Sequence, residues 1–298
     1  MVIRATGLWC RVMGDGKVYN CRLRGSYRLR GSKQTNPVAV GDYVEYELQD
    51  DGTGVVTDVC DRRNYIVRRA TKLSKQTHVI AANIDLMCIV ATVEHPRTST
   101  GFVDRLLATA EAYGIETCLI YNKCDLYDNN TLQKFNTLKE VYNNVGYKVY
   151  SVSATQNVGI QELRATIQGK TVLFCGHSGS GKSSLLNAID SSLHLKVGEV
   201  SEWSDKGTHT TTFAEMFPFA NGYIIDTPGI KEFGMVDFKE NDLSHYFPEM
   251  RALQSRCRFA NCTHRHEPGC AVIQAAEEGL VAPERYKNYL SILDGLTT

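Results

Sequence analysis

Residues 176–183 read GHSGSGKS and match the phosphate-binding loop pattern in full. They follow an apolar run, 171–175, which predicts a buried strand, and they open a predicted helix over 182–189. The glycines let successive backbone N–H groups face a phosphate, and the helix N-terminus adds positive potential. We expect Lys182 to reach the β- and γ-phosphates of a nucleotide and the Ser183 hydroxyl to bind Mg²⁺. The residues expected to contact the nucleotide here are Gly176, His177, Ser178, Gly179, Ser180, Gly181, Lys182, Ser183 and Ser184.

A second motif predicts which base is bound. It follows the predicted strand 117–121, at the edge of the sheet where α/β proteins bind ligands. A carboxylate at Asp125 can accept from both N1–H and the 2-amino group of guanine, an arrangement that adenine does not offer. Ser153 and Ala154 follow the next predicted strand, and a backbone N–H there can meet the guanine oxygen. The residues of the motif itself are Asn122, Lys123, Cys124 and Asp125.

Two further segments are expected to sense the γ-phosphate. Residues 226–229, DTPG, end another predicted strand, so Asp226 can hold Mg²⁺ through water and the Gly229 N–H can meet the γ-phosphate. Residues 207–212 read GTHTTT, and one of these threonines should supply a second hydroxyl to Mg²⁺. We favour Thr211, with Thr210 and Thr212 as alternatives.

The order of these motifs differs from that of common GTPases, in which the phosphate loop comes first. Here the Asn-Lys-x-Asp and Ser-Ala motifs precede the phosphate loop, the threonines and Asp-x-x-Gly. This order indicates a circular permutation of the same sheet and pocket. It also connects the second switch directly to the C-terminal part of the chain, which is therefore well placed to respond to the γ-phosphate.

The catalytic machinery is less evident. Ile230 stands where Ras-like proteins carry a glutamine that orients the attacking water, so slow hydrolysis by the free protein is expected. His209, beside the switch threonines, is the best candidate to act on water, together with Lys182 and Thr211 around the phosphates. The alternative is that His209 is only a loop residue.

The N-terminal 70 residues have a different pattern. Short β-rich runs between turns predict five strands, 8–13, 18–23, 27–29, 42–48 and 54–59, and hence a small barrel. Residues 1–36 hold eight Lys/Arg and one acid, which favours an RNA-binding face, although a solvated basic face is the alternative. Residues 62–85, rich in arginine and polar residues, are interpreted as a linker.

Beyond the linker, apolar strand-like runs alternate with helical patterns, which predicts an α/β domain with a mainly parallel sheet. Its expected strands include 86–93, and its first expected helix lies within 102–113. The whole chain of 298 residues has zero formal net charge, so a nucleic-acid surface must be local. No apolar run approaches the ~20 residues that span a bilayer, and the N-terminus has no signal-like core. We therefore expect a cytoplasmic protein with no membrane partner.

A group of metal-ligating residues lies near the C-terminus, between short predicted helices that include 271–278 and 283–293. Three thiolates and one imidazole with this spacing fit a closed, structural Zn²⁺ site. His266 is a rival for the histidine position, Glu267 is a weaker one, and reduced free cysteines are the alternative to a metal site. The expected ligands are Cys257, Cys262, His264 and Cys270.

Together, the barrel, the permuted GTPase motifs and the Cys-x4-Cys-x-His-x5-Cys knuckle resemble the small-ribosomal-subunit biogenesis GTPases of the RsgA family (also called YjeQ or YloQ) over essentially the whole chain. The resemblance implies an OB-fold domain at 1–70, a circularly permuted P-loop GTPase domain at 71–235 and a helical zinc-knuckle domain at 236–298. It implies GTP hydrolysis to GDP, stimulated by the small ribosomal subunit and its rRNA, and a role in late maturation of that subunit. We expect a monomer that uses Mg²⁺ with GTP and one structural Zn²⁺. The rival interpretations are a P-loop kinase or small-molecule NTPase and a zinc-containing RNA-binding module with a vestigial nucleotide site.

Overall fold

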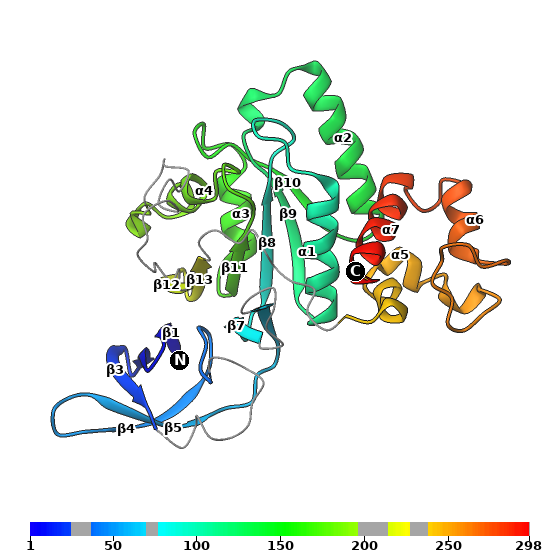
Figure 1. The fold of residues 1–298 in the computed structure, drawn as a ribbon. Coiled ribbons are helices and arrows are strands. Elements are labelled where there is room, and N and C mark those ends of the chain that lie inside the picture. The colour runs from blue at the N-terminus through cyan, green and yellow to red at the C-terminus, as the bar shows by residue number, and fades with distance from the viewer. Residues whose placement is uncertain (25–36, 70–76, 196–213, 227–237, 298) are drawn as a thin grey trace, which may run out of the picture.

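The computed structural model describes residues 1–24, 37–69, 77–195, 214–226 and 238–297. Figure 1 shows a strand-rich N-terminal part, a central sheet flanked by helices, and a helical C-terminal part beside α1. Within the described residues, no helix combines the length and the apolar character needed to cross a membrane.

The N-terminal strands form the predicted barrel, in the order β1-β2-β3-β5-β4. The barrel closes because the Val2 amide donates to the Asp42 carbonyl oxygen and the Gly41 amide donates to that of Val2, both at 2.8 Å. Its interior is filled by small apolar side chains such as Val12 and Val56. The predicted strand at 27–29 lies outside the described residues. The strands are β1 (Val2–Thr6), β2 (Trp9–Gly14), β3 (Lys17–Leu23), β4 (Val44–Leu48) and β5 (Gly54–Val59).

The prediction that 62–85 is a linker is wrong. Strands β6 (Tyr65–Arg69) and β7 (Thr77–Ala82) pair in an antiparallel two-stranded sheet, one on each side of the domain boundary predicted at residue 70. Arginines suggested a solvated linker, but Arg62 forms a bidentate ion pair with fully buried Asp42, at 2.7 and 2.8 Å. Ile66 joins the main core from the same segment.

The predicted α/β domain contains a sheet in the order β10-β9-β8-β11-β13-β12, parallel except for β12. The strand that precedes the phosphate loop, β11, lies in its centre, between β8 and β13. Edge strand β12 also meets β1, with Arg4 opposite Glu215, so the sheet continues into the barrel. The strands are β8 (Leu86–Ala91), β9 (Glu116–Tyr121), β10 (Lys148–Ser151), β11 (Thr171–Cys175), β12 (Glu215–Phe219) and β13 (Gly222–Asp226).

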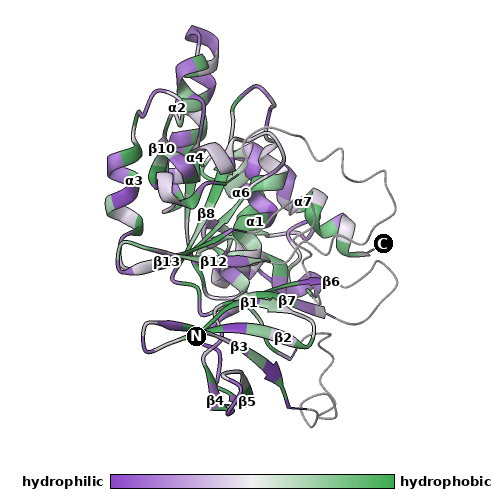
Figure 2. Ribbon diagram, turned by 90° about the vertical axis from the view of Figure 1, so that its left-hand side faces the viewer, coloured by the Kyte–Doolittle hydropathy of each residue, from purple (hydrophilic) through white to green (hydrophobic). Residues whose placement is uncertain are grey.

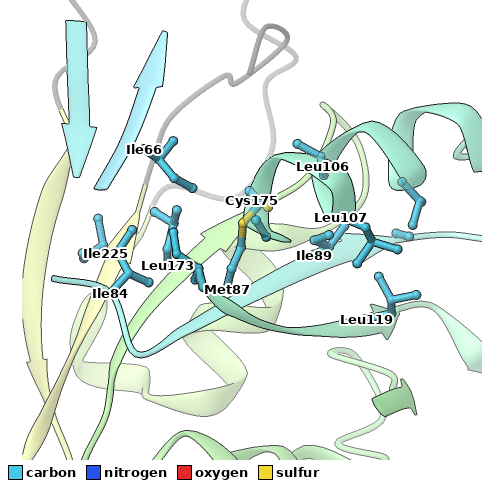
Figure 3. Close-up of a cluster of buried hydrophobic side chains, with 14 of the residues drawn as sticks. Ile66, Ile84, Met87, Ile89, Leu106, Leu107, Leu119, Leu173, Cys175 and Ile225 are labelled. Atoms are coloured by element: carbon cyan, nitrogen blue, oxygen red, sulfur yellow. The ribbon is translucent and has the colours of Figure 1, made fainter. Parts of the chain in front are cut away.

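Helices cover both faces of this sheet, which explains why its strands are continuously apolar. Helices α1 (Thr100–Ala112) and α2 (Asn129–Asn144) pack on one face, and α3 (Ile160–Ile167) and α4 (Lys182–Ile189) on the other. Figure 3 shows Leu106 and Leu107 of α1 among the side chains of the sheet. In Figure 2 the outer helices α2 and α3 carry hydrophilic colour alongside hydrophobic colour, as amphipathic helices do.

The C-terminal part is a small helical unit with its own core, which Ala108 of α1 also joins. Phe247 and Tyr289 meet edge to face at its centre, with ring centroids 5.4 Å apart. The helices predicted at 271–278 and 283–293 are confirmed. Its elements are η5 (Glu240–Tyr246), α5 (Pro248–Arg251), η6 (Gln254–Arg256), α6 (Ala271–Glu277) and α7 (Pro283–Thr297).

Candidate nucleotide site and metal cluster

The phosphate loop joins β11 to α4, as predicted, and its glycines are required by close contacts. A Cβ at Gly176 would collide with the carbonyl oxygen of Val90 on β8. Gly181 has φ +81°, and a Cβ there would collide with the side-chain amide of Asn122. The loop backbone can therefore pass close to its neighbours only because these residues lack a Cβ. Helix α4 begins directly after Gly181, and its first turn carries Lys182, Ser183 and Ser184.

Asn122 brings three predicted motifs together. Its side-chain N–H donates to the Ser180 carbonyl oxygen of the phosphate loop at 3.0 Å. Its Oδ1 accepts from the Ala154 amide at 3.2 Å. The residue is 2% exposed, and its bond to Ser180 is buried. One buried amide thus ties the base motif to the phosphate loop and to the Ser-Ala segment.

The base motif turns sharply after β9. Lys123 has φ +67° and donates from Nζ to the His95 carbonyl oxygen at 2.6 Å. Cys124 then begins a short 3₁₀ helix, η2 (Cys124–Leu126), which presents Asp125 at the surface. The Asp125 carboxylate accepts from the Thr155 hydroxyl at 3.3 Å. Thr155 was not predicted as a site residue, although it directly follows the Ser-Ala motif.

Ser153 supports this arrangement from within the fold. It is fully buried, and its hydroxyl accepts from the Gln156 amide at 3.1 Å. Its side chain therefore shapes the turn after β10, while the neighbouring Ala154 amide bonds to Asn122.

Lys182 and Asp226 meet in an ion pair between the start of α4 and the end of β13. Both side chains are mostly buried, 12% and 15% exposed. Two residues that the sequence assigned to phosphate and to magnesium thus lie side by side. The switch residues Thr210, Thr211, Thr212, His209, Gly229 and Ile230 lie outside the described residues.

His177 of the phosphate loop contacts the segment that follows β8, which the sequence did not indicate. Its Nε2 lies 2.5 Å from the Thr98 hydroxyl, and its Nδ1 lies 2.6 Å from the Ser178 carbonyl oxygen. The ring also meets Phe102 of α1 edge to face, with centroids 6.0 Å apart. No sequence motif marks 92–99, so only the fold reveals this contact.

The four predicted metal ligands come together near the C-terminus, with their ligand atoms all within 4.8 Å of one another. The His264 Nδ1 lies 3.2 Å from Cys270 Sγ and 3.7 Å from Cys257 Sγ. Burial lowers the pKa of His264 and so favours the neutral, metal-binding form of the imidazole. Burial also raises the pKa of the Cys262 thiol to about 12, so a nearby cation is needed to hold it as a thiolate. This donor set fits a tetrahedral metal ion.

Glu267, the weaker rival ligand, instead organises the loop. Its carboxylate accepts from the Thr263 amide and hydroxyl, both at 2.6 Å, and from the Arg265 amide at 2.9 Å. The other rival, His266, is exposed and is not part of the cluster among the described residues.

Comparison with known proteins now decides the family. Residues 59–236 match the model of the RsgA GTPase, and residues 1–56 match the RsgA N-terminal domain. The chain belongs to the RsgA GTPase family. It is therefore a GTPase, as predicted, and the interpretation as a P-loop kinase is wrong.

Relatives and solved structures support the assignment along the whole chain. A protein of Bacteroides thetaiotaomicron named small ribosomal subunit biogenesis GTPase RsgA 2 is 47% identical, covering 99% of this chain and 96% of that protein. A Flavobacterium johnsoniae relative named small ribosomal subunit biogenesis GTPase RsgA is also 47% identical, covering 99% and 92%. The YjeQ structure from Thermotoga maritima is 36% identical with a TM-score of 0.81, covering 100% and 97%. YloQ, described as a circularly permuted GTPase, is 28% identical with a TM-score of 0.76, covering 99% and 93%.

Proposed function

We propose that this protein binds the small ribosomal subunit and its rRNA and acts in late maturation of that subunit, with GTP hydrolysis as its timing step. The observation that carries the proposal is the buried Asn122 amide, which joins the base motif to the phosphate loop. The chain is also similar over its full length to proteins named small ribosomal subunit biogenesis GTPase RsgA. A base motif and a phosphate loop that are held together in this way argue against a vestigial nucleotide site. We place the protein in the cytoplasm, where bacterial ribosomal subunits are assembled. We propose that it acts as a monomer.

The described residues support a division of labour around GTP. Asp125 pairs with the N1–H and 2-amino groups of guanine. The Ala154 amide, which donates to Asn122 in this structure, turns to the guanine oxygen when the base binds. Lys182 binds the β- and γ-phosphates, while Ser183 and Asp226 hold Mg²⁺, which neutralises phosphate charge. The ion pair between Lys182 and Asp226 separates as the lysine turns to phosphate. The Gly229 N–H meets the γ-phosphate, and Thr211 supplies the second hydroxyl to Mg²⁺.

Hydrolysis needs a group that orients water, and Ile230 cannot provide one. We assign this role to His209, beside the Thr211 that binds Mg²⁺. Contact of the bound subunit with the protein then places His209 against the attacking water, which accounts for stimulated turnover.

Stimulation by the subunit is tested by steady-state GTP hydrolysis with purified ribosomal subunits. Turnover should rise severalfold or more with small subunits and little with large subunits. His209→Ala should lower the stimulated rate. Equal rates with and without small subunits would contradict the proposal, and the absence of any turnover would favour an RNA-binding module with a vestigial site.

We also propose that Cys257, Cys262, His264 and Cys270 hold one structural Zn²⁺. Support comes from the compact cluster of three thiols and one imidazole, three of its four residues being buried. With four protein ligands the ion has no open position, so it contributes to folding of the C-terminal unit rather than to chemistry.

Two neighbouring histidines give this zinc assignment a matched test. His264→Ala removes a ligand from the cluster and should weaken zinc binding at least about tenfold. His266→Ala, two residues away on an exposed side chain, should leave zinc affinity unchanged. Competition with a chromophoric chelator measures both, and a larger effect of His266→Ala would transfer the ligand role to that residue.

A further inference from the structure

Helix α1 lies between the sheet of the GTPase domain and the C-terminal unit. Leu106 and Leu107 belong to the core that the helix forms with the sheet (Figure 3), whereas Ala108 belongs to the C-terminal core. Figure 1 shows α7 along the side of α1 that faces away from β8. A displacement of α1 therefore has to be accommodated by both units, because close-packed cores deform little.

The C-terminal unit is bonded to α1 by a buried polar network. Asp104 is fully buried and accepts from Arg285 Nη1 at 2.6 Å, from Asn288 Nδ2 at 2.7 Å and from the Tyr142 hydroxyl at 3.0 Å. Arg285 also forms a bidentate pair with Glu249, at 2.7 and 2.9 Å. Every charged group of the network thus has a partner, which fixes the position of α7 against α1.

Helix α7 also forms hydrogen bonds to the first turn of α1. The Thr100 hydroxyl donates to Glu284 at 2.9 Å and accepts from Asn288 Nδ2 at 3.0 Å. Ser99 caps the helix, its hydroxyl accepting from the Phe102 amide at 3.2 Å. The contacts between α7 and this end of α1 are therefore only two residues away from Thr98.

Thr98 connects this end of the helix to the phosphate loop. Its hydroxyl accepts from the Thr92 amide at 2.9 Å, so its own proton is available to the His177 Nε2 at 2.5 Å. The His177 Nδ1 then carries the ring proton and donates to the Ser178 carbonyl oxygen at 2.6 Å. The imidazole thus bonds to the phosphate-loop backbone through Nδ1 and to Thr98, just before α1, through Nε2. The Phe102 ring of α1 packs against it.

We propose that Thr98 and His177 are positioning residues through which α1 couples the C-terminal unit to nucleotide affinity. Contacts of α7 with Thr100 and Asp104 set the position of the first turn of α1, and the Thr98 hydroxyl transmits that position to the phosphate loop. This connection is separate from the chain segment 227–237 that links Asp226 to the C-terminal unit.

A double-mutant cycle on GDP affinity tests this coupling in the free protein, without ribosomes. Thr98→Val removes the hydroxyl that meets His177, and Asn288→Ala removes the amide that meets Thr100 and Asp104. Each single variant should weaken GDP binding by about two- to thirtyfold, the range of coupling found for residues along such networks. The double variant should be no weaker than the weaker single variant, because both changes act through one connection.

Controls separate coupling from loss of fold. Thr137→Val and Asn144→Ala make the same chemical changes on exposed positions of α2 and should leave GDP affinity unchanged. Thr98→Ser keeps the hydroxyl and should restore affinity. If Asn288→Ala unfolds the C-terminal unit, as seen by circular dichroism, Glu284→Ala replaces it, since alanine cannot accept the hydrogen bond that this exposed glutamate accepts from the Thr100 hydroxyl.

Two results would overturn the proposal. Effects that multiply in the double variant would show that the two sites act independently, and an unchanged GDP affinity in the α7 variants would show that the C-terminal unit does not reach the phosphate loop. Because ribosomal subunits are absent from the assay, neither result bears on the proposed role in subunit maturation.

Discussion

Asp125→Asn is expected to weaken GDP binding by about 100-fold and to improve binding of xanthosine diphosphate. The carboxylate accepts two hydrogen bonds from guanine, and charged hydrogen bonds of this kind contribute about 1.5–3 kcal/mol each. An amide in its place accepts one bond and sets an N–H against guanine donors, whereas it complements the extra oxygen of xanthine. Competition binding with the two diphosphates measures the change.

A neighbouring hydroxyl offers the control for this experiment. Thr155→Val removes the group that donates to Asp125 at 3.3 Å but keeps the carboxylate, so it should weaken GDP only slightly and should not improve xanthine binding. An Asp125→Asn variant with unchanged GDP affinity would show that the base motif is misassigned, even though the chain is a GTPase.

Arg285→Met is expected to lower the free energy of unfolding by about 3–5 kcal/mol, because it leaves fully buried Asp104 and mostly buried Glu249 without their cation. Arg285 is 2% exposed, and Asp104 is fully buried.

The stability loss should depend on pH. Burial already raises the pKa of Asp104, and Arg285 opposes that shift, so removing the arginine should raise this pKa further. A carboxyl group whose pKa is higher in the folded than in the unfolded protein stabilises the fold more as the pH falls. The loss of unfolding free energy in Arg285→Met should therefore be smaller at acidic pH. Urea unfolding at two pH values measures both effects.

Arg251→Met is the matched control, since Arg251 pairs with Glu111 of the same helix α1 at 3.1 Å but is half exposed. Exposed pairs contribute about 0–1 kcal/mol, so this variant should unfold almost as the parent does. Equal losses in the two variants would mean that the buried network does not stabilise the junction.

The central sheet was predictable because each of its strands leaves a local signal. Strands buried on both faces are continuously apolar, as in 86–91, and phosphate-loop residues follow one of them directly. Motif order then gave the permutation, since it depends only on sequence positions. The cluster of three cysteines and one histidine was predictable for a similar reason, because its four residues lie within a stretch of 14 residues.

The linker at 62–85 shows where local reasoning failed. Its arginines resembled a solvated segment, but Arg62 reaches 20 residues back to buried Asp42, and alternate residues such as Ile66 point into the core. A charge whose partner is distant in sequence looks unpaired until the fold brings the two together.

Contacts within the candidate site were hidden for the same reason. Asn122 meets the phosphate loop 58 residues away, and Thr98 meets His177 79 residues away. Both residues are of ordinary type, and Thr98 belongs to no motif, so no local pattern singles out the second contact.

The affinity of the small ribosomal subunit for the protein in its two nucleotide states tests the central claim most directly. If GTP binding is the switch, a non-hydrolysable GTP analogue should tighten subunit binding relative to GDP by about 5- to 150-fold, which corresponds to a coupling of about 1–3 kcal/mol. By linkage, the subunit should tighten binding of the analogue relative to GDP by the same factor. Equal subunit affinity in the two nucleotide states would contradict the account, even for an active GTPase.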